Sequence, residues 1–314
     1  MPDVRLPKIS VVTPSYNQGR FIEDTILSVI GQGYPNLEYI VIDGGSTDET
    51  VEVLKKYDDK ITYWVSEKDS GQASALNKGF ARATGDILCW LNSDDMYLPG
   101  TLKYISTRLD ISRPEMLIGN CVHIREGTGA AIGSDIVSDC RRHDIAWCSY
   151  VIQPSSFWTR AVWEAAGKLD ESLNYALDWD WFIRAKMAKA EFIAVERHLS
   201  VYRIHAAHKS SFGGETRAKE LGGVYKRYHN ARGVELFQVL RRNRIRAAVI
   251  RRLIDLPYIY TRRNQGLDLI ITKAPNKLAA SLLYVLGMLG FRFVCPVLSM
   301  RYSTQEVRDV LRML

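Results

Sequence analysis

The chain has 314 residues, of which 46% are hydrophobic and 25% charged, the composition of an ordinary globular protein with one large domain or two modest ones. Its five cysteines are scattered without a C-x-x-C pair, which argues against a zinc site and favours reduced thiols. The net charge of +7 is unevenly distributed along the chain. Residues 226–314 hold 17 Lys+Arg and 5 Asp+Glu, whereas residues 1–225 hold 25 Lys+Arg and 30 Asp+Glu. The basic C-terminal part predicts an anionic partner, either a membrane surface or a nucleic acid.

Strand and helix patterns alternate through the first hundred residues. Short buried strands are expected at residues 9–13, 37–42, 61–65 and 87–91. Helices are expected between them, at about residues 22–30, 48–57 and 72–83. This alternation predicts right-handed crossovers and a largely parallel sheet. Ligands bind at the carboxyl ends of the strands in such sheets, and the polar turns at 13–17, 43–48 and 92–95 fall there.

The pattern is less regular from residue 116 to Gly214. A strand is expected at 116–118, helices at 160–166 and 179–188, and strands at 192–195 and 199–204. Gly213-Gly214 is a plausible domain boundary, and the chain beyond it has a mostly helical pattern.

The acidic turn Asn92-Ser93-Asp94-Asp95 is the most informative stretch of the chain. It follows the apolar run 87–91, so two carboxylates and an amide lie where a buried strand leaves the sheet. Mg²⁺ prefers oxygen ligands and typically takes one or two carboxylates together with water and substrate phosphates. The turn therefore suggests a metal that holds a diphosphate, although Asn, Ser and Asp are also ordinary turn formers.

Three earlier loops are candidates for nucleotide contacts. The loop 13–17 has small and hydroxyl residues that allow the backbone to approach a nucleotide, and Asp43 can accept hydrogen bonds from a base or ribose. Asp69 could contact a base, and Asn77 a phosphate. The alternatives are a plain strand-to-helix loop, an Asx-turn at Asp43 and a helix start capped by Asp69.

Two later segments carry groups suited to catalysis. Asp178 lies between an apolar residue and Trp179, and desolvation raises the pKa of a carboxyl group and makes it a better base. Trp179 could offer a face for sugar stacking. The basic cluster after the strand at 199–204 is suited to a departing diphosphate, and it contains Arg203, His205, Lys209 and Ser210. The alternative for Asp178 is a helix cap, with Trp179 in the core. The alternative for the basic cluster is a solvated loop.

The C-terminal region combines basic and apolar residues. Six arginines lie between Arg241 and Arg252 among aliphatic residues, and an apolar run follows at 278–291. Basic helices with apolar faces suit an anionic lipid surface, and fourteen residues are too few to span a bilayer. A membrane-surface segment is preferred here over an ordinary packed helix or a true span.

The order of these motifs resembles family 2 glycosyltransferases. The resemblance covers about residues 8–212 and depends on segments 10–17, 42–48, 83–86, 91–95, 177–178 and 202–205. It implies a GT-A fold, an α/β nucleotide-binding sandwich with a Rossmann-like, mostly parallel sheet. It also implies inverting sugar transfer from a nucleotide-diphosphate sugar.

Residue by residue, the resemblance makes Asp94 the metal-binding acid of the D-x-D motif and Asp178 the catalytic base. Three positions depart from the family pattern: Asn92 replaces the first acid of D-x-D, Gly44 replaces the second Asp of a frequent pair, and Leu177 replaces a frequent Glu. The expected nucleotide contacts are Thr13, Pro14, Ser15, Tyr16, Asp43, Asp69, Asn77, Asn92 and Ser93. The expected ligands of Mn²⁺ or Mg²⁺ are Asp94, Asp95 and His205. The expected contacts to the diphosphate or the acceptor are Arg203, Lys209, Ser210, Trp179 and Gln153.

The sequence thus predicts a glycosyltransferase that uses a UDP-sugar and a glycan or lipid-linked acceptor in cell-surface polysaccharide synthesis. Residues 1–212 would form the GT-A domain, and residues 213–314 a basic, mostly helical region. Because Met1–Arg5 leads directly into a strand pattern, no signal peptide is expected. The protein is expected in the cytoplasm, peripheral at the inner face of the cell membrane, with no nucleic-acid partner. The alternatives are a sugar-nucleotide nucleotidyltransferase and a non-enzymatic scaffold that binds membranes or nucleic acid through its C-terminal region.

Overall fold

The computed structural model describes residues 6–129, 131–134, 136–206, 209, 213–242, 309, 310 and 313. They fall into two compact units. The first comprises the described residues up to Ile145 together with Ser149–Glu220, and the second Ala146–Cys148 with the described residues from Leu221 onwards. The predicted contact Ser210 and the apolar run 278–291 lie outside the described residues.

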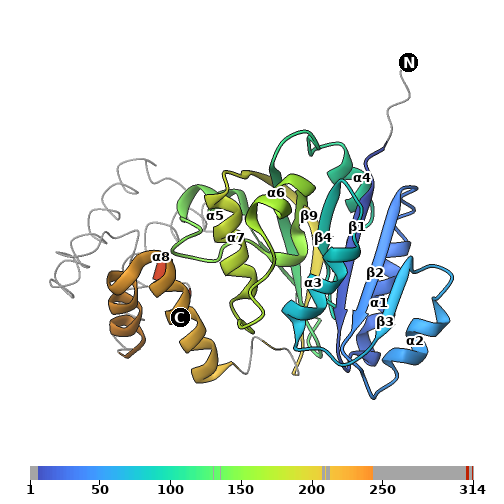
Figure 1. Ribbon diagram of the computed structural model, residues 1–314, viewed down its shortest axis with the longest axis horizontal. Coiled ribbons are helices and arrows are strands. Elements are labelled where there is room, and N and C mark those ends of the chain that lie inside the picture. Colours follow the sequence, from blue (N-terminus) through green and yellow to red (C-terminus); the bar gives the residue numbers. More distant parts are fainter. Residues whose placement is uncertain are drawn as a thin grey trace, which may run out of the picture. The chain divides into compact units, whose positions relative to one another are not determined.

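A mixed sheet forms the centre of the first unit (Figure 1). Its strands are β1 (Ile9–Ser15), β2 (Leu37–Asp43), β3 (Tyr63–Ser66), β4 (Ile87–Trp90), β5 (Met96–Tyr97), β6 (Glu115–Arg125), β7 (Ala131–Gly133), β8 (Ser156–Thr159) and β9 (Glu191–Ile204). The order is β3-β2-β1-β4-β8-β6-β9-β5, with β7 paired to β6. The first four strands are parallel, β8 is antiparallel to β4 and β6, and β6 and β9 are parallel. The predicted mostly parallel sheet is confirmed.

Helices connect these strands. They are α1 (Gly19–Ile30), α2 (Thr50–Lys56), α3 (Gln72–Arg82), α4 (Thr101–Ser106), α5 (Ile136–Arg142), η1 (Gln153–Ser155), α6 (Arg160–Ala166), α7 (Leu177–Met187) and α8 (Gly214–Arg242). Within α8, Asn230 has φ 54° and ψ −149°, which interrupts the helix. The first turns of α8, up to Glu220, belong to the first unit, and the rest to the second. No helix in the described part of the chain is long and apolar enough to cross a membrane.

The two strands predicted at 192–195 and 199–204 form one long strand, β9. Its pairing with β6 shifts register near Asn120, so that Ala194 pairs with Ile118 and His198 with Asn120. The polar residues that separated the two predicted strands therefore lie in a β-bulge, which adds residues to one strand without ending it.

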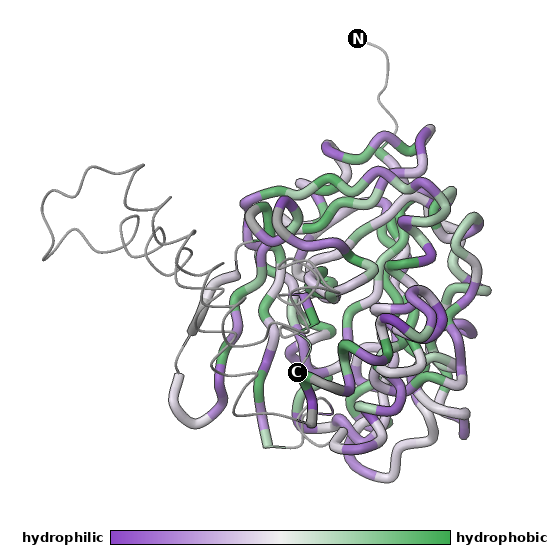
Figure 2. The backbone as a smooth tube through the Cα atoms, turned by 90° about the vertical axis from the view of Figure 1, so that its left-hand side faces the viewer, coloured by the Kyte–Doolittle hydropathy of each residue, from purple (hydrophilic) through white to green (hydrophobic). Residues whose placement is uncertain are grey.

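Buried apolar side chains hold α3 and α7 against the sheet. Every residue of β1 is buried. A Cβ added to Gly79 of α3 would lie 2.4 Å from Val12 Cγ1, so only glycine permits this close approach of α3 to β1. Trp90, Trp158 and Trp181 pack together, with ring centroids 4.6–6.2 Å apart, and fix α7 against β4 and β8. In Figure 2, hydrophobic stretches recur between hydrophilic ones along the described chain.

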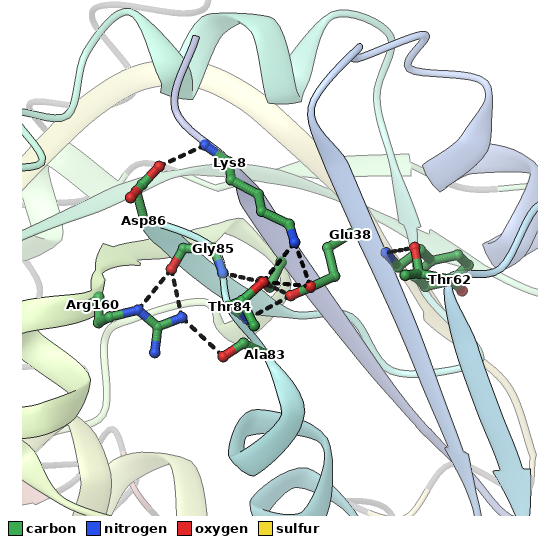
Figure 3. A network of polar contacts seen from close by, with 10 residues as sticks. Lys8, Glu38, Thr62, Ala83, Thr84, Gly85, Asp86 and Arg160 are labelled. Atoms are coloured by element: carbon green, nitrogen blue, oxygen red, sulfur yellow. Dashed lines mark hydrogen bonds and ion pairs between the residues drawn. The ribbon is translucent and has the colours of Figure 1, made fainter. Parts of the chain in front are cut away.

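Polar side chains close the amino ends of β1, β2 and β4 (Figure 3). The carboxylate of Glu38 accepts hydrogen bonds from Lys8 Nζ (2.6 Å), Ser10 Oγ (2.5 Å), and the Thr84 backbone N–H (2.7 Å) and hydroxyl (2.6 Å). Burial alone would raise the pKa of Glu38, but these donors outweigh it and lower the pKa to about 2. We refer to Lys8, Ser10, Glu38 and Thr84 as the Glu38 network.

In the second unit, Tyr225 donates a hydrogen bond from its hydroxyl to the carbonyl of Trp147 (2.8 Å). The imidazole of His229 stacks on the indole of Trp147, with 3.7 Å between ring centroids. These contacts join α8 to the short segment Ala146–Cys148 and form part of the core of this unit.

Candidate active site

A cavity of about 850 Å³ lies at the carboxyl ends of β1, β2 and β4, entirely within the first unit. Its walls come from the loops after these strands, the start of α3, the loop before η1, the start of α7 and Lys209. The volume is within the range of roughly 300–1,000 Å³ typical of small-molecule sites. This is the edge of the sheet where the predicted polar turns were expected to meet.

One end of the cavity is lined by the end of β1 and by the loops after β1, β2 and β3. The residues there are Pro14, Ser15, Tyr16, Gly44, Gly45 and Asp69. Ser15 is only 5% exposed, and its hydroxyl has no hydrogen-bond partner among the described residues. Buried polar groups are almost always paired, so this hydroxyl is suited to contact a ligand or water in the cavity.

Gly44 explains how Asp69 reaches the cavity. A Cβ added to Gly44 would lie 3.2 Å from both carboxylate oxygens of Asp69. An aspartate at position 44, as in the frequent Asp pair of the family, would crowd Asp69 and repel its charge. The absence of a side chain at Gly44 thus leaves room for the Asp69 carboxylate, which the loop after β3 supplies to the cavity.

Three residues predicted to contact the nucleotide are not among the residues that line the cavity. Thr13 is buried with its hydroxyl 3.2 Å from Tyr39 Oη, and Asp43 is fully buried. Both carboxylate oxygens of Asp43 are used locally, by the backbone N–H groups of Gly45 and Ser46 and by the hydroxyls of Ser46 and Ser66. This geometry is the alternative Asx-turn.

Asn77 is the third of these residues. Its side chain brackets the backbone of Leu169, accepting from its N–H and donating to its carbonyl, both at 3.0 Å, and also donates to Glu171. The structure therefore gives Asn77 a packing role between α3 and the loop before α7.

The acidic turn after β4 presents Asp94, but not Asp95, to the cavity. Asp94 Oδ2 lies 3.1 Å from His205 Nε2, and the His205 ring packs against Phe21 with 4.4 Å between centroids. Asp95 is buried, and its Oδ1 accepts a hydrogen bond from the Arg203 backbone N–H. Burial, followed by the nearby charge of Asp94, raises the pKa of Asp95 well above its usual value.

The Arg203 guanidinium is not among the groups that line the cavity. It donates to Asp24 on α1 at 3.0 Å and to Met96 Sδ, and lies 5.1 Å from the centre of the Phe21 ring. The negative charge of Asp24 thus holds the Arg203 side chain against α1.

A divalent cation fits this site only if substrate completes its coordination. No group of three or more His, Cys, Asp or Glu side chains in the described residues could hold a metal ion. Asp94 offers one carboxylate to the cavity, and the buried imidazole of His205 contacts that carboxylate from outside the cavity lining. Mg²⁺ is commonly bound through one or two carboxylates plus substrate phosphates and water, so Asp94 fits a cation shared with a diphosphate.

A continuous chain of hydrogen bonds borders the cavity. Lys209 Nζ donates to Gln72 Oε1 (2.8 Å), Gln72 Nε2 to Asn92 Oδ1 (2.8 Å), and Asn92 Nδ2 to Gln153 Oε1 (3.0 Å). Gln153 Nε2 then donates to the Trp90 carbonyl (2.7 Å). An ammonium can only donate and a carbonyl can only accept, so the two ends fix the orientation of all three amides. We call Lys209, Gln72, Asn92 and Gln153 the amide chain.

Gln72 was not among the predicted site residues. Its position at the start of α3, after the loop containing Asp69, was the available signal, but its partners are remote in sequence. The amide chain also gives Asn92 a role that an aspartate could not fill, because a carboxylate has no N–H to donate to Gln153.

Asp178 reaches the cavity from the first turn of α7. Its Oδ1 accepts a hydrogen bond from the Trp179 backbone N–H at 2.7 Å. Burial raises the pKa of Asp178, and this exceeds the opposing effects of that hydrogen bond and of the charges of Lys209 and Arg217. The Trp179 indole is buried and donates to the Ile145 carbonyl, so it faces the core rather than the cavity.

The mixed sheet thus carries one cavity lined by Asp94, which contacts His205, and by the separate Asp178, an arrangement similar to that of nucleotide-sugar glycosyltransferases. Residues 10–149 match the model of glycosyl transferase family 2. The chain is 27% identical over 231 residues to an uncharacterised glycosyltransferase of Rickettsia prowazekii, covering 65% of this chain and 66% of the relative. It is 37% identical over 126 residues to the putative teichuronic acid biosynthesis glycosyltransferase TuaG of Bacillus subtilis, covering 39% and 50%. The chain thus spans half to about two thirds of the length of these relatives.

Solved structures agree with this fold. TarS residues 1–349 of S. aureus, in complex with UDP-GlcNAc, has a TM-score of 0.58 at 16% identity, over 98% of this chain and 89% of that one. The mannosyltransferase PcManGT of Pyrobaculum calidifontis, in complex with GDP-Man and Mn²⁺, has a TM-score of 0.50 at 18% identity, over 95% and 75%. These comparisons confirm the predicted resemblance to family 2 glycosyltransferases and the GT-A fold.

Proposed function

We propose that this protein transfers a sugar, with inversion, from a UDP-sugar to a hydroxyl of a glycan or lipid-linked acceptor in cell-surface polysaccharide synthesis. The observation that carries the proposal is that Asp94, which contacts His205, and Asp178 line one cavity of about 850 Å³. The UDP-GlcNAc bound to TarS and the teichuronic acid pathway in the name of TuaG support the donor and the kind of product.

In this proposal the donor nucleotide lies against the loops after β1 and β2. The Ser15 hydroxyl, which has no partner in the described part of the chain, can donate or accept a hydrogen bond. The Asp69 carboxylate can accept one. The diphosphate then extends toward Asp94 and His205. Mn²⁺ or Mg²⁺ held there with the diphosphate would supply positive charge where negative charge develops on the leaving group.

Asp178 is the proposed general base. As the acceptor oxygen bonds to the anomeric carbon and the bond to the diphosphate oxygen breaks, Asp178 takes the proton of the acceptor hydroxyl. Its raised pKa makes it a better proton acceptor than an exposed aspartate. Lys209 has a pKa lowered by burial, lies beside Asp178 and is tied to Gln72, which suits it to contact the diphosphate.

A thermal-shift screen of nucleotide sugars, with and without Mn²⁺, tests the donor assignment. UDP and UDP-GlcNAc should raise the melting temperature more than GDP-mannose, and chelation of the cation should remove most of the shift. Transfer or hydrolysis of the selected donor should follow. A protein stabilised equally by all nucleotides, and inactive on every donor, would contradict the proposal.

Membrane attachment through the basic C-terminal region stays a prediction of the sequence. The full chain should float with vesicles that contain phosphatidylglycerol and not with neutral phosphatidylcholine vesicles. Replacement of Arg241, Arg242, Arg244 and Arg246 by Gln should weaken flotation. Unchanged flotation of this variant would count against these arginines as the attachment.

A further inference from the structure

Glu220, on α8, holds the loop that leads into the helix of the proposed base. Its Oε2 accepts hydrogen bonds from three successive backbone N–H groups, those of Asn174 (3.0 Å), Tyr175 (2.6 Å) and Ala176 (3.1 Å). All four residues belong to the first unit. One carboxylate oxygen therefore fixes the backbone of three consecutive residues, of which the last is the N-cap of α7.

The position of this contact matters because Asp178 is the second residue of α7. The N-cap residue Ala176 has no side chain that can cap the helix, and no side-chain cap hydrogen bond forms at this end. Glu220 supplies an acceptor and a negative charge from a distant part of the chain, which stabilises the first turn. The backbone immediately before Leu177 and Asp178 is thus held by a residue 44 positions beyond Ala176.

The start of α8 also packs closely against this loop. A Cβ added to Gly213 would lie 2.5 Å from Arg217 Cβ and 3.0 Å from Tyr175 Cε1, so the start of α8 closes tightly onto the loop. Glu220 also affects the pKa of Lys209, the other charged group beside Asp178. Burial lowers the pKa of Lys209, whereas the carboxylates of Asp178 and Glu220 oppose that shift and favour the ammonium form.

We propose that Glu220 is a positioning residue for Asp178, holding the 174–176 segment so that the Asp178 carboxylate faces the acceptor hydroxyl. The inference rests on the proposed role of Asp178. Glu220 itself does not touch substrate. It was not among the predicted site residues, because its partners are backbone groups of a segment remote in sequence.

Glu220→Ala and Glu220→Gln in the full chain test the proposal, with Glu164→Ala as a control that removes an exposed carboxylate from α6. Amide hydrogen exchange reports the loop directly and needs no substrate. Glu220→Ala should speed exchange at residues 174–178 and leave β1 and β4 unchanged. Glu220→Gln retains a carbonyl acceptor and should give a smaller increase, and Glu164→Ala none.

Kinetics then separate positioning from general stability. With Mn²⁺ and UDP-GlcNAc as the probe, Glu220→Ala should lower kcat by about 10- to 100-fold, because a displacement of about 1 Å can cost that much. The Kd of UDP should stay unchanged, since the hydrogen bonds of Glu220 go to residues 174–176 and not to the loops after β1 and β2. Glu220→Gln should recover most of the lost kcat.

Unchanged exchange at 174–178, or wild-type kcat in Glu220→Ala, would overturn the inference. So would faster exchange across the whole sheet together with weaker UDP binding, because Glu220 would then be a general stabiliser. Failure of the proposed function has another signature: the wild type and Asp178→Asn would process the donor equally, while the exchange measurement would still report the contact of Glu220 with the loop.

Discussion

The two ends of the central strands carry polar networks of opposite character. At the amino ends, Glu38 is buried and saturated, with four hydrogen bonds from Lys8, Ser10 and Thr84. At the carboxyl ends, the amide chain borders a cavity in which the Ser15 hydroxyl has no partner among the described residues. The first arrangement stabilises the native state, whereas the second leaves groups that a ligand can satisfy. Substitutions at the amino ends should therefore lower the stability of the fold, whereas substitutions at the carboxyl ends should lower turnover or ligand binding.

The largest effect is expected at Asp178. Asp178→Asn removes the proposed base without changing its size, so turnover should fall by about 10²- to 10⁴-fold while UDP still binds. Donor turnover and calorimetric UDP binding measure the two quantities. Turnover close to that of the wild type would mean that another group accepts the proton.

The pH profile of the wild type gives an independent check of Asp178. A base must be deprotonated to act, so activity should rise with pH through the pKa of Asp178. Because burial raises that pKa, the acid limb of the kcat profile should lie above the ordinary range of an aspartate, near 3.9. An acid limb at or below the ordinary value would contradict the desolvated environment.

A smaller loss is expected at Asp94. Asp94→Ala removes the carboxylate of the Asp94–His205 pair and should weaken Mn²⁺-dependent donor binding by about 10- to 100-fold, by analogy with the loss of metal-site partners. Binding measured with and without chelator isolates the cation-dependent part. Asp24→Ala is a matched control, because Asp24 contacts Arg203 outside the cavity. Equal donor affinity of Asp94→Ala and the wild type would exclude Asp94 as a ligand.

At the opposite end, Glu38→Gln should cost stability and leave catalysis intact. The amide loses the charge that strengthens the four hydrogen bonds, and the expected loss is about 2 kcal/mol of unfolding free energy. The folded-state pKa of Glu38 is lowered to about 2, so its contribution is present above the unfolded pKa near 4.3 and is lost as pH falls toward 2. Urea unfolding at pH 7 and pH 3 should show a smaller difference between variant and wild type at pH 3. If Glu38→Gln had wild-type stability but weaker UDP binding, the amino ends would serve ligand binding rather than stability, which would contradict this account.

The smallest effect is expected within the amide chain. Gln72→Ala removes two hydrogen bonds, the one from Lys209 and the one to Asn92. Only the first holds a group proposed to contact the diphosphate, and its loss of about 1 kcal/mol predicts a roughly fivefold lower kcat. The melting temperature should fall by only a few degrees. A loss as large as that of Asp178→Asn would mean that Lys209, rather than Asp178, limits turnover.

Much of the fold could be predicted because apolar runs and helical spacing are local signals. The strands from β1 to β4 and the position of the acidic turn follow from them. What could not be predicted is which side chains face the cavity. Every residue of β1 is buried, so alternation does not distinguish the two faces, and Thr13 faces Tyr39 whereas Ser15 reaches the cavity.

Contacts between residues far apart in the sequence account for the other differences between the predicted and the observed site. Arg203 extends to Asp24 on α1, and Asn77 brackets Leu169 far along the chain. Gln72 and Glu220 depend on contacts of the same kind, between residues separated by many positions. Sequence pattern predicts the residue types at the edge of a sheet, but not these pairings.

A crystal structure of the chain with Mn²⁺ and UDP-GlcNAc tests the central claim most directly. It should contain the cation between the Asp94–His205 pair and the diphosphate, and Asp178 facing the anomeric carbon from the side opposite the leaving oxygen. A nucleotide bound outside this cavity, or Asp178 on the same side of the sugar as the diphosphate, would contradict the proposed reaction.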